Sequence, residues 1–326
     1  TFYKIVDILG RVDLSVVPEE LYEDYKENYD ITYIEQDIKR NILCVEKFSC
    51  CIIMTLINKE ICMQNYVEEK RALQAVDFNC DIAQGWGVFQ NSDEAKFLDY
   101  VSSVNIACGM HSGDPIGIKN AFDMLKDRNI AIGAHIGFPD ISGFGNRKMN
   151  LSEEEIEAIV LYQVGALIKF ADAYGLRIEH VRPHGAMYKM AAVDFDFSMS
   201  IAKAIKKAGE WLVYVGAASE VLDRVKEEAN ITVARELNLV LPYNTDGSAV
   251  YDKTEITNIE FCLKRLEKLL RNSDIKTIES TYIHIPFDTI HFSTTSQISL
   301  ELAKRASQFA KPSPINYNNA YNLGWV

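Results

Sequence analysis

Long apolar runs are missing from this sequence of 326 residues. The most apolar stretch, residues 50–56, is far shorter than the roughly 20 residues that a membrane-spanning helix needs. A basic stretch followed by an apolar core is also missing near residue 1, so the pattern of a signal peptide is absent. We therefore expect a cytoplasmic protein without a membrane partner.

Positive charge is in short supply, because 34 lysine and arginine residues stand against 46 aspartate and glutamate residues and leave a formal net charge of −12. An acidic chain repels phosphate backbones, which excludes nucleic acid as a partner. Seven cysteines are present, but CxxC pairs are missing, and we expect no disulfide framework. The cysteines between residues 44 and 62 have the wrong spacing for a zinc cluster, and burial among apolar residues is the better interpretation.

Two common catalytic signatures are missing as well. The sequence has no Walker A motif, so we do not expect ATP to bind this chain through a P-loop, and it has no G-x-S-x-G nucleophile elbow. Gly143-Phe144-Gly145 is not a dinucleotide fingerprint, because it lacks the third glycine and follows a loop. This segment predicts either a mobile lid over a site or a tight turn that needs positive φ.

What the sequence does have, from residue 76 onward, is a regular alternation of short β-rich runs and amphipathic helical stretches. Strands are predicted at residues 75–80, 104–107, 130–134, 178–181, 211–215, 231–234 and 281–285. Helices are predicted near residues 93–100, 115–128, 153–174, 196–208, 218–228, 255–271 and 296–309. Such alternation indicates an α/β fold with a parallel sheet, which is either a barrel or an open doubly wound sheet.

The two ends of the chain differ from this alternating part. Residues 1–75 contain one glycine and no chemical motif, and we interpret them as a small N-terminal extension of unknown role. Residues 311–326 contain two prolines and several polar residues, and we interpret them as a C-terminal surface tail. The alternating domain therefore spans residues 76–310.

Polar side chains recur directly after the predicted strands. They are Asn79, Asp81, Asn105, His111, Asp114, His135, Asp140, His184 and His284. Because the carboxyl ends of parallel strands converge on one mouth of a barrel, we expect Asp81 and the histidines of this set to meet around one small molecule. Imidazole and carboxylate groups together can bind a divalent metal or move protons.

Several of these residues have a purely structural alternative. A single histidine in a strand-to-helix loop more often packs and forms hydrogen bonds than takes part in chemistry. Asp114 is expected mainly to cap its helix, because a proline follows it, and Asp140 could simply hold the glycine-rich loop around it. His180 lies within a predicted strand and is interpreted as structural, while His291 has no clear partner.

Six blocks of the sequence resemble the LamB/YcsF family, in that family's order and spacing. They are residues 77–81 (DFNCD), 105–115 (NIACGMHSGDP), 133–140 (GAHIGFPD), 143–145 (GFG), 162–167 (YQVGAL) and 181–188 (VRPHGAMY). The resemblance covers about residues 76–310. It implies a seven-stranded (β/α) barrel, similar to the glycoside hydrolase/deacetylase superfamily.

The resemblance also implies a function, the ATP-dependent hydrolytic opening of the 5-oxoproline lactam to glutamate. In that role the chain is an A-type subunit of 5-oxoprolinase that acts with partner subunits of the B and C types. The partners would activate the lactam carbonyl with ATP, and the A-type subunit would complete the hydrolysis of the ring.

The family's polar positions fall on residues of this chain to which we assign roles. The predicted catalytic residues are Asp81, His111, His135 and His184, the predicted substrate-binding residues are Asn79, Asn105, Asp114, Asp140 and His284, and a possible divalent metal would bind Asp81, His111 and His184. Opening a lactam needs a base for water, a proton donor for the leaving nitrogen and stabilisation of the oxyanion. We assign the base or metal ligand to Asp81 or His184. His111 and His135 would orient the substrate or stabilise the oxyanion.

The sequence departs from the family pattern at three places. Gly-Glu after the first aspartate block is replaced by residues 83–84 (AQ), Phe-Ala-Asp-Arg by residues 238–241 (NLVL), and His-Gly-Asp by residues 284–286 (HIP). Acidic groups and an arginine are therefore missing. Two alternatives to the 5-oxoprolinase function follow, a non-catalytic binding or regulatory homologue and a metal-dependent hydrolase of the deacetylase type.

Overall fold

The computed structural model describes residues 75–85, 87 and 93–315. Apart from residue 75, the predicted N-terminal extension lies outside the described residues, and so do the cysteines between residues 44 and 62 and the tail from residue 316 onward. Within the described ranges, Cys80, Cys108 and Cys262 are buried free thiols. No helix in this part of the chain is long and apolar enough to cross a membrane.

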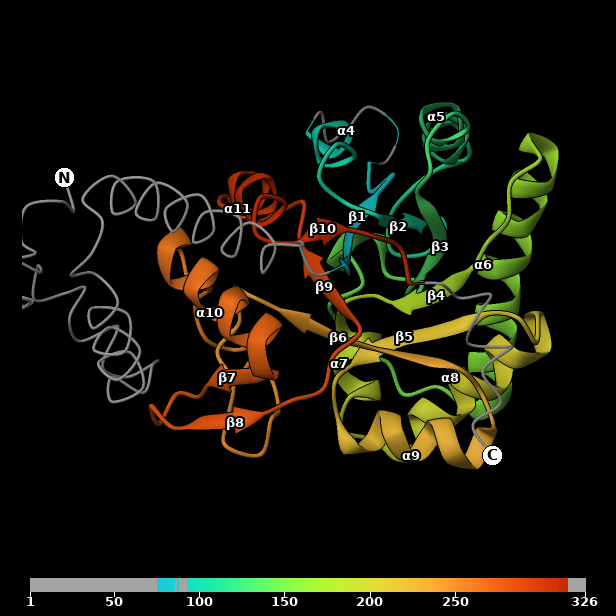
Figure 1. Cartoon of the computed structure of the whole chain (residues 1–326). Coiled ribbons are helices and arrows are strands. Elements are labelled where there is room, and N and C mark those ends of the chain that lie inside the picture. The colour runs from blue at the N-terminus through green and yellow to red at the C-terminus, as the bar shows by residue number, and fades with distance from the viewer. Residues whose placement is uncertain (1–74, 86, 88–92, 316–326) are drawn as a thin grey trace, which may run out of the picture. The chain divides into compact units, whose positions relative to one another are not determined.

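Seven parallel strands form a closed barrel (Figure 1). Strand β9 pairs with β6 on one side and with β1 on the other, and this double pairing closes the ring. The barrel strands are β1 (Ala75–Ile82), β2 (Ser103–Ala107), β3 (Ala131–Ile136), β4 (His180–Pro183), β5 (Val213–Ala217), β6 (Val233–Asn238) and β9 (Thr289–Phe292). The predicted seven-stranded α/β barrel is confirmed.

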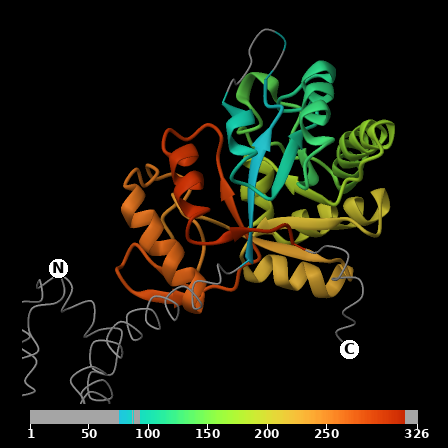
Figure 2. The same cartoon turned by 45° about the horizontal axis from the view of Figure 1, so that its top comes forward.

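Helices cover the outside of the ring (Figures 1 and 2). They are α4 (Glu94–Phe97), α5 (Pro115–Leu125), α6 (Glu153–Tyr174), α7 (Gly185–Ala191), α8 (Phe195–Ala208), α9 (Glu220–Ala229), α10 (Ile259–Asn272) and α11 (Ser299–Ala306). Local chemistry explains their starts. Asp114 accepts a hydrogen bond from the amide of Gly117 and caps α5, and Ser152 and Glu155 form a complete capping box on α6.

The predicted last barrel strand, residues 281–285, is wrong. Its central part forms β8 (Tyr282–His284), which pairs antiparallel with β7 (Asp274–Lys276) in a separate two-stranded sheet beside α10 (Figure 1). The seventh barrel strand is β9, a few residues later. Both segments are short and rich in β-formers, so periodicity cannot tell which of them pairs with β1.

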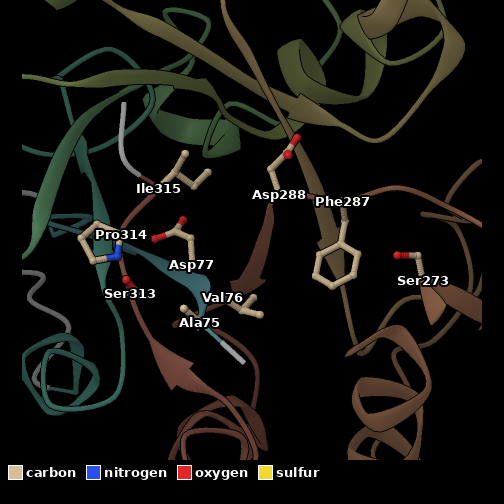
Figure 3. A pocket seen from close by; sticks show the side chains of 9 residues that line it. All are labelled: Ala75, Val76, Asp77, Ser273, Phe287, Asp288, Ser313, Pro314 and Ile315. Atoms are coloured by element: carbon tan, nitrogen blue, oxygen red, sulfur yellow. The ribbon is translucent and has the colours of Figure 1, made fainter. Parts of the chain in front are cut away.

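The end of the barrel at which the strands begin is closed by the C-terminal part of the described chain. Strand β10 (Lys311–Pro312) pairs with Ala75 and Val76, and Ile315 packs against a small apolar cluster of strand residues. Residues 311–315 of the predicted tail are therefore paired with or packed against the barrel, and Lys311 stays exposed. A cavity of about 220 Å³ lies at this end, lined among others by Asp77, Phe287 and Asp288 (Figure 3).

Strand β1 shows how polar groups come to lie inside the barrel. Successive side chains of a strand point to opposite faces. Phe78 and Ile82 belong to the apolar core between strands and helices. The alternate residues Asp77, Asn79 and Asp81 instead form buried hydrogen bonds with residues of other strands. The interior therefore holds a column of polar side chains along β1.

Candidate functional site

Three histidines meet at the end of the barrel where the strands finish. His111 lies in the loop after β2, His135 is in β3, and His184 is the N-cap of α7 directly after β4. The rings of His111 and His184 are stacked with centroids 4.0 Å apart, and His135 meets both edge-on. One ligand atom from each of the three lies within 4.8 Å of the others, which is close enough for one metal ion. The predicted convergence of these three histidines is thus found in the structure.

Glycines and a glutamine make the space that His111 occupies. A Cβ atom on Gly137 would lie 2.4 Å from Nδ1 of His111, and a Cβ atom on Gly145 would lie 2.8 Å from the Cβ of His111. Gln163 of α6 holds Gly137 in place by accepting a hydrogen bond from its N–H (2.9 Å) and donating one to its carbonyl (3.1 Å). Phe144 and Gly145 have φ of +50° and +66°, so this segment is a tight turn of the kind that one of our two interpretations predicted.

Backbone carbonyls hold two of the three rings. Nδ1 of His135 lies 3.1 Å from the carbonyl oxygen of Arg182, and Nε2 of His184 lies 2.8 Å from the carbonyl oxygen of Phe144. The other ring nitrogens of these two histidines, Nε2 of His135 and Nδ1 of His184, face each other at 3.0 Å. Both ring nitrogens of His111 are buried and have no hydrogen-bond partner among the described residues.

Asp81 is the centre of the charged groups beside the histidines. Its Oδ1 accepts hydrogen bonds from Nδ2 of Asn105 (2.9 Å) and Nη1 of Arg182 (3.3 Å), and its Oδ2 lies 3.1 Å from Nε2 of His291 and 3.4 Å from Nε2 of His135. Burial opposes its ionisation, but the charges of His135, Arg182 and His291 outweigh burial and hold the pKa of Asp81 well below its usual range. Asp81 is therefore a carboxylate at neutral pH.

Arg182 joins this carboxylate to a second one. Its Nε and Nη2 donate two hydrogen bonds of 2.7 Å to the two oxygens of Glu236 at the end of β6, and the guanidinium lies 4.8 Å from the ring centre of Tyr188. Burial raises the pKa of Glu236, but the charge of Arg182 outweighs it, so the pKa lies below its ordinary value. The two carboxylates and one guanidinium leave one negative charge beside the histidines.

Burial raises the pKa of a carboxyl group, but it lowers the pKa of an imidazole. It lowers the pKa of His184 to about 3 and, together with the nearby His184 and His135, lowers the pKa of His111 well below its ordinary value. Both rings are therefore neutral near pH 7, which is the state that accepts a proton or binds a cation.

Comparison with known proteins places this barrel among its relatives. The model of the LamB/YcsF family matches residues 76–322. The chain belongs to the LamB/YcsF family. It is 36% identical over 237 residues to a protein of Bacillus thuringiensis subsp. konkukian that is named as the A-type subunit of 5-oxoprolinase, covering 72% of this chain and 94% of that protein. It is 32% identical over 243 residues to a protein of the same name from Campylobacter jejuni subsp. jejuni, covering 74% and 95%.

A solved structure agrees with this assignment. The lactam utilization protein from Thermus thermophilus superposes with a TM-score of 0.68 at 32% sequence identity, and the match covers 72% of this chain and 96% of that one. The LamB/YcsF resemblance seen in the sequence blocks is thus confirmed. These similarities extend over the barrel, which carries the histidines.

The other residues predicted for the LamB/YcsF site fall into two groups. Asn79 and Asn105 are hydrogen-bonded to each other inside the barrel, and Asn105 also contacts Asp81. Asp114 and Asp140 instead hold loops, because Asp114 accepts from Gly87 and Gly117 while Asp140 accepts from the backbone and side chain of Arg147. The substrate-binding role of these four residues stays a prediction.

The prediction that His284 lies at the mouth is wrong. This histidine belongs to β8 outside the barrel, its side chain is 65% exposed, and its Nδ1 donates to the carbonyl of Asn272. His291 of β9 lies beside Asp81 in its place. We assigned this position to His284 because we placed the last barrel strand at residues 281–285. The histidine on the actual seventh strand is His291, for which the sequence indicated no partner.

Sequence reasoning also missed Arg182 and Glu236. Arg182 lies within a block that matched the LamB/YcsF pattern, and Glu236 lies in β6, shortly before the segment that departs from that pattern. A charged residue within a strand that is buried on both faces needs an opposite charge nearby, and this rule was the available signal. The spacing of 54 residues between the two partners could not be read from local patterns.

Two departures from the LamB/YcsF pattern have visible structural effects. Ala83, where the family usually has glycine, adopts φ of +57°, a conformation that glycine favours. The carboxylate of Glu94 accepts the backbone N–H groups of Ala83 and Gln84 at 2.7 and 3.1 Å, so an acidic group remains close to the position of the missing glutamate. Val240 and Leu241 stand where the family has aspartate and arginine; Val240 is buried in the apolar core and Leu241 packs against it.

Proposed function

We propose that this chain hydrolyses a cyclic amide as an A-type subunit of 5-oxoprolinase, opening 5-oxoproline to glutamate. The observation that carries the proposal is the meeting of His111, His135 and His184 with Asp81 at the end of the barrel where βα-barrel enzymes bind substrates. The relatives named as A-type subunits of 5-oxoprolinase and the lactam utilization protein support the substrate class.

The arrangement suits the chemistry of a lactam. The resonance-stabilised amide must lose its planarity when water adds to the carbonyl carbon, and the leaving nitrogen must then gain a proton. Asp81 is a buried carboxylate beside His135, and we expect it to take the proton of water and to return it to the leaving nitrogen. His111, His135 and His184 lie together next to it and would orient the substrate or hold a cation that stabilises the oxyanion.

ATP and the partner subunits belong to the same proposal. The sequence lacks a Walker A motif, so we assign ATP-dependent activation of the carbonyl to B-type and C-type subunits. The A-type subunit then supplies the buried imidazoles and carboxylates that complete the hydrolysis.

The test measures glutamate formed from 5-oxoproline and ATP by the full chain together with purified B-type and C-type subunits. We expect turnover with the wild-type chain and a loss of at least about 100-fold with His184→Ala. Arg128→Ala, which removes an exposed ion pair with Asp99, serves as the control and should retain full turnover. A folded wild-type chain that adds nothing to the activity of the partners alone would contradict the proposal and favour a non-catalytic homologue.

A second candidate function is metal-dependent hydrolysis of an open-chain amide, such as an N-acetyl group. The specific observation that favours it is the convergence of three imidazoles within 4.8 Å. This reaction needs neither ATP nor partner subunits. Release of acetate from N-acetylated sugars by the isolated chain, activated by added divalent metal, would therefore distinguish it from the lactam reaction.

A further inference from the structure

The hydrogen bonds to backbone carbonyls decide where the ring protons of two histidines lie. A carbonyl oxygen only accepts, so the ring nitrogen that faces it must donate. Nδ1 of His135 faces the carbonyl of Arg182 at 3.1 Å and carries the proton of that ring. Nε2 of His184 faces the carbonyl of Phe144 at 2.8 Å and carries the proton of the other ring. A ring that carries only this one proton has a lone pair on its second nitrogen.

These two lone pairs point at each other. Nε2 of His135 and Nδ1 of His184 are 3.0 Å apart, a distance at which two acceptors repel unless something positive lies between or beside them. A shared proton would satisfy His135 and His184 alone. It would leave both buried nitrogens of His111 without a partner, and a buried polar atom without a partner costs stability.

We propose that His111, His135 and His184 bind one divalent transition-metal ion of the zinc type through their imidazole nitrogens. One ion beside the three rings satisfies the opposed lone pairs and the unpartnered ring together. Ligating histidines in proteins commonly donate their second ring N–H to a backbone carbonyl, which is the arrangement of His135 and His184 here. The ligand set predicted from the sequence changes accordingly, because His135 takes the place of Asp81.

The charges around the site favour a cation. Asp81 and Glu236 are two carboxylates that face one guanidinium, that of Arg182, so these three groups together leave one negative charge beside the three rings. Oδ2 of Asp81 lies 3.4 Å from Nε2 of His135, where it neutralises charge without serving as a ligand. Three imidazole nitrogens suit zinc, cobalt or nickel, whereas magnesium and calcium prefer oxygen.

The distances require a small adjustment of one ring. Nitrogens bound to one tetrahedral ion lie about 3.4 Å apart when each metal–nitrogen bond is about 2.0–2.1 Å. The three candidate atoms lie within 4.8 Å of one another, so the widest gap closes by at most about 1.4 Å. His111 is the ring whose movement would break no hydrogen bond among the described residues, since neither of its nitrogens has a partner there. In a tetrahedral site, three histidines would leave the fourth coordination position to water or to an oxygen of the substrate.

The test is a metal titration of the full chain without substrate or partner subunits, so its outcome does not depend on the lactam reaction. Tag-free protein, stripped with a chelator, is titrated with Co²⁺ by visible absorption and with Zn²⁺ by calorimetry. We expect one equivalent to bind, with the visible bands of a tetrahedral cobalt site. His111→Gln and His184→Gln should each weaken the affinity by at least about 100-fold.

His284→Ala is the matched control, because it removes an exposed histidine outside the barrel and should leave the metal affinity at the wild-type value. Circular dichroism and the melting temperature of each metal-free variant separate lost binding from lost folding. Wild-type protein that binds no equivalent of either metal would overturn the proposal in favour of a shared proton. His111→Gln binding as tightly as the wild type would overturn the three-histidine ligand set.

Discussion

The two ends of the barrel bury a carboxyl group in opposite ways, although both groups lie on β1 and only three residues separate them. Asp81 contacts Arg182 and two histidines, and its pKa lies well below the usual range. Asp77 receives hydrogen bonds from the hydroxyl groups of Ser103 and Thr289, and burial raises its pKa to about 6. The burial is the same, so the charge of the neighbours decides the state of each group.

The two ends differ in empty space as well. The cavity of about 220 Å³ lies beside Asp77, where the surrounding hydroxyl groups satisfy the carboxyl (Figure 3). The histidines lie at the other end, where ring nitrogens of His111 have no partner among the described residues. The unpartnered ring nitrogens therefore lie at the end of the barrel where we propose the site, and the cavity lies at the other end. The strand ends lead to the same conclusion.

The largest effect is expected when the positive charge at the histidine end is removed. Arg182→Ala leaves Asp81 and Glu236 buried without their common partner, and we expect the free energy of unfolding to fall by about 3–5 kcal/mol. Urea unfolding at pH 7 measures this loss. Arg128→Ala, at an exposed ion pair, should cost less than about 1 kcal/mol. Equal losses of unfolding free energy in Arg182→Ala and Arg128→Ala would contradict the expected difference between a buried and an exposed ion pair.

The second largest effect is a change of stability with pH, and it arises from Asp77 at the end of the barrel where the strands begin. The pKa of Asp77 is about 6 in the folded chain against an ordinary 3.8, so between these values the folded state holds a proton that the unfolded state has released. Asp77 therefore contributes stability that is full below pH 3.8 and is lost as pH rises through 6, by about 3 kcal/mol in total. Asp77→Asn should abolish this loss in unfolding curves measured from pH 4 to pH 7. A profile that is unchanged in the variant would show that Asp77 is ionised like Asp81.

The smallest effect concerns backbone strain at the histidine end. Ala83 follows β1 with φ of +57°, and an alanine in this left-handed conformation costs about 1–2 kcal/mol that a glycine does not. Glycine loses more backbone entropy on folding, so Ala83→Gly should raise the stability by at most about 1 kcal/mol. Thermal unfolding detects such a gain. A lower melting temperature would mean that the Ala83 methyl group packs well enough to offset the strain.

The sequence was sufficient for six of the seven barrel strands and for the three histidines, because these features depend on local patterns. Residues 153–174 were predicted as a helix with the bounds that α6 has, since a capping box marks its start and Gly175 ends it with positive φ. The seventh strand was misplaced because its pairing with β1 joins residues more than 200 positions apart. No local pattern reports such a contact.

The charged part of the site was harder to predict for a related reason. Arg182, Glu236 and His291 lie on three different strands. Their role depends on their contacts with one another and with Asp81. Their identities in the sequence are compatible with exposed positions on a strand. The closed barrel makes them neighbours, and closure is a property of the whole sheet.

The alternation along β1 has a consequence for how this sequence can change over evolutionary time. Asp77, Asn79 and Asp81 share one face, and deletion of a single residue between Asp77 and Asp81 would turn one part of this column outward against the helices. We therefore expect insertions and deletions within β1 to be more damaging than replacements. A replacement alters the contacts of one side chain, whereas a shift of the strand by one residue alters the contacts of several. We therefore expect the spacing of these three residues to be kept even where one of them is replaced.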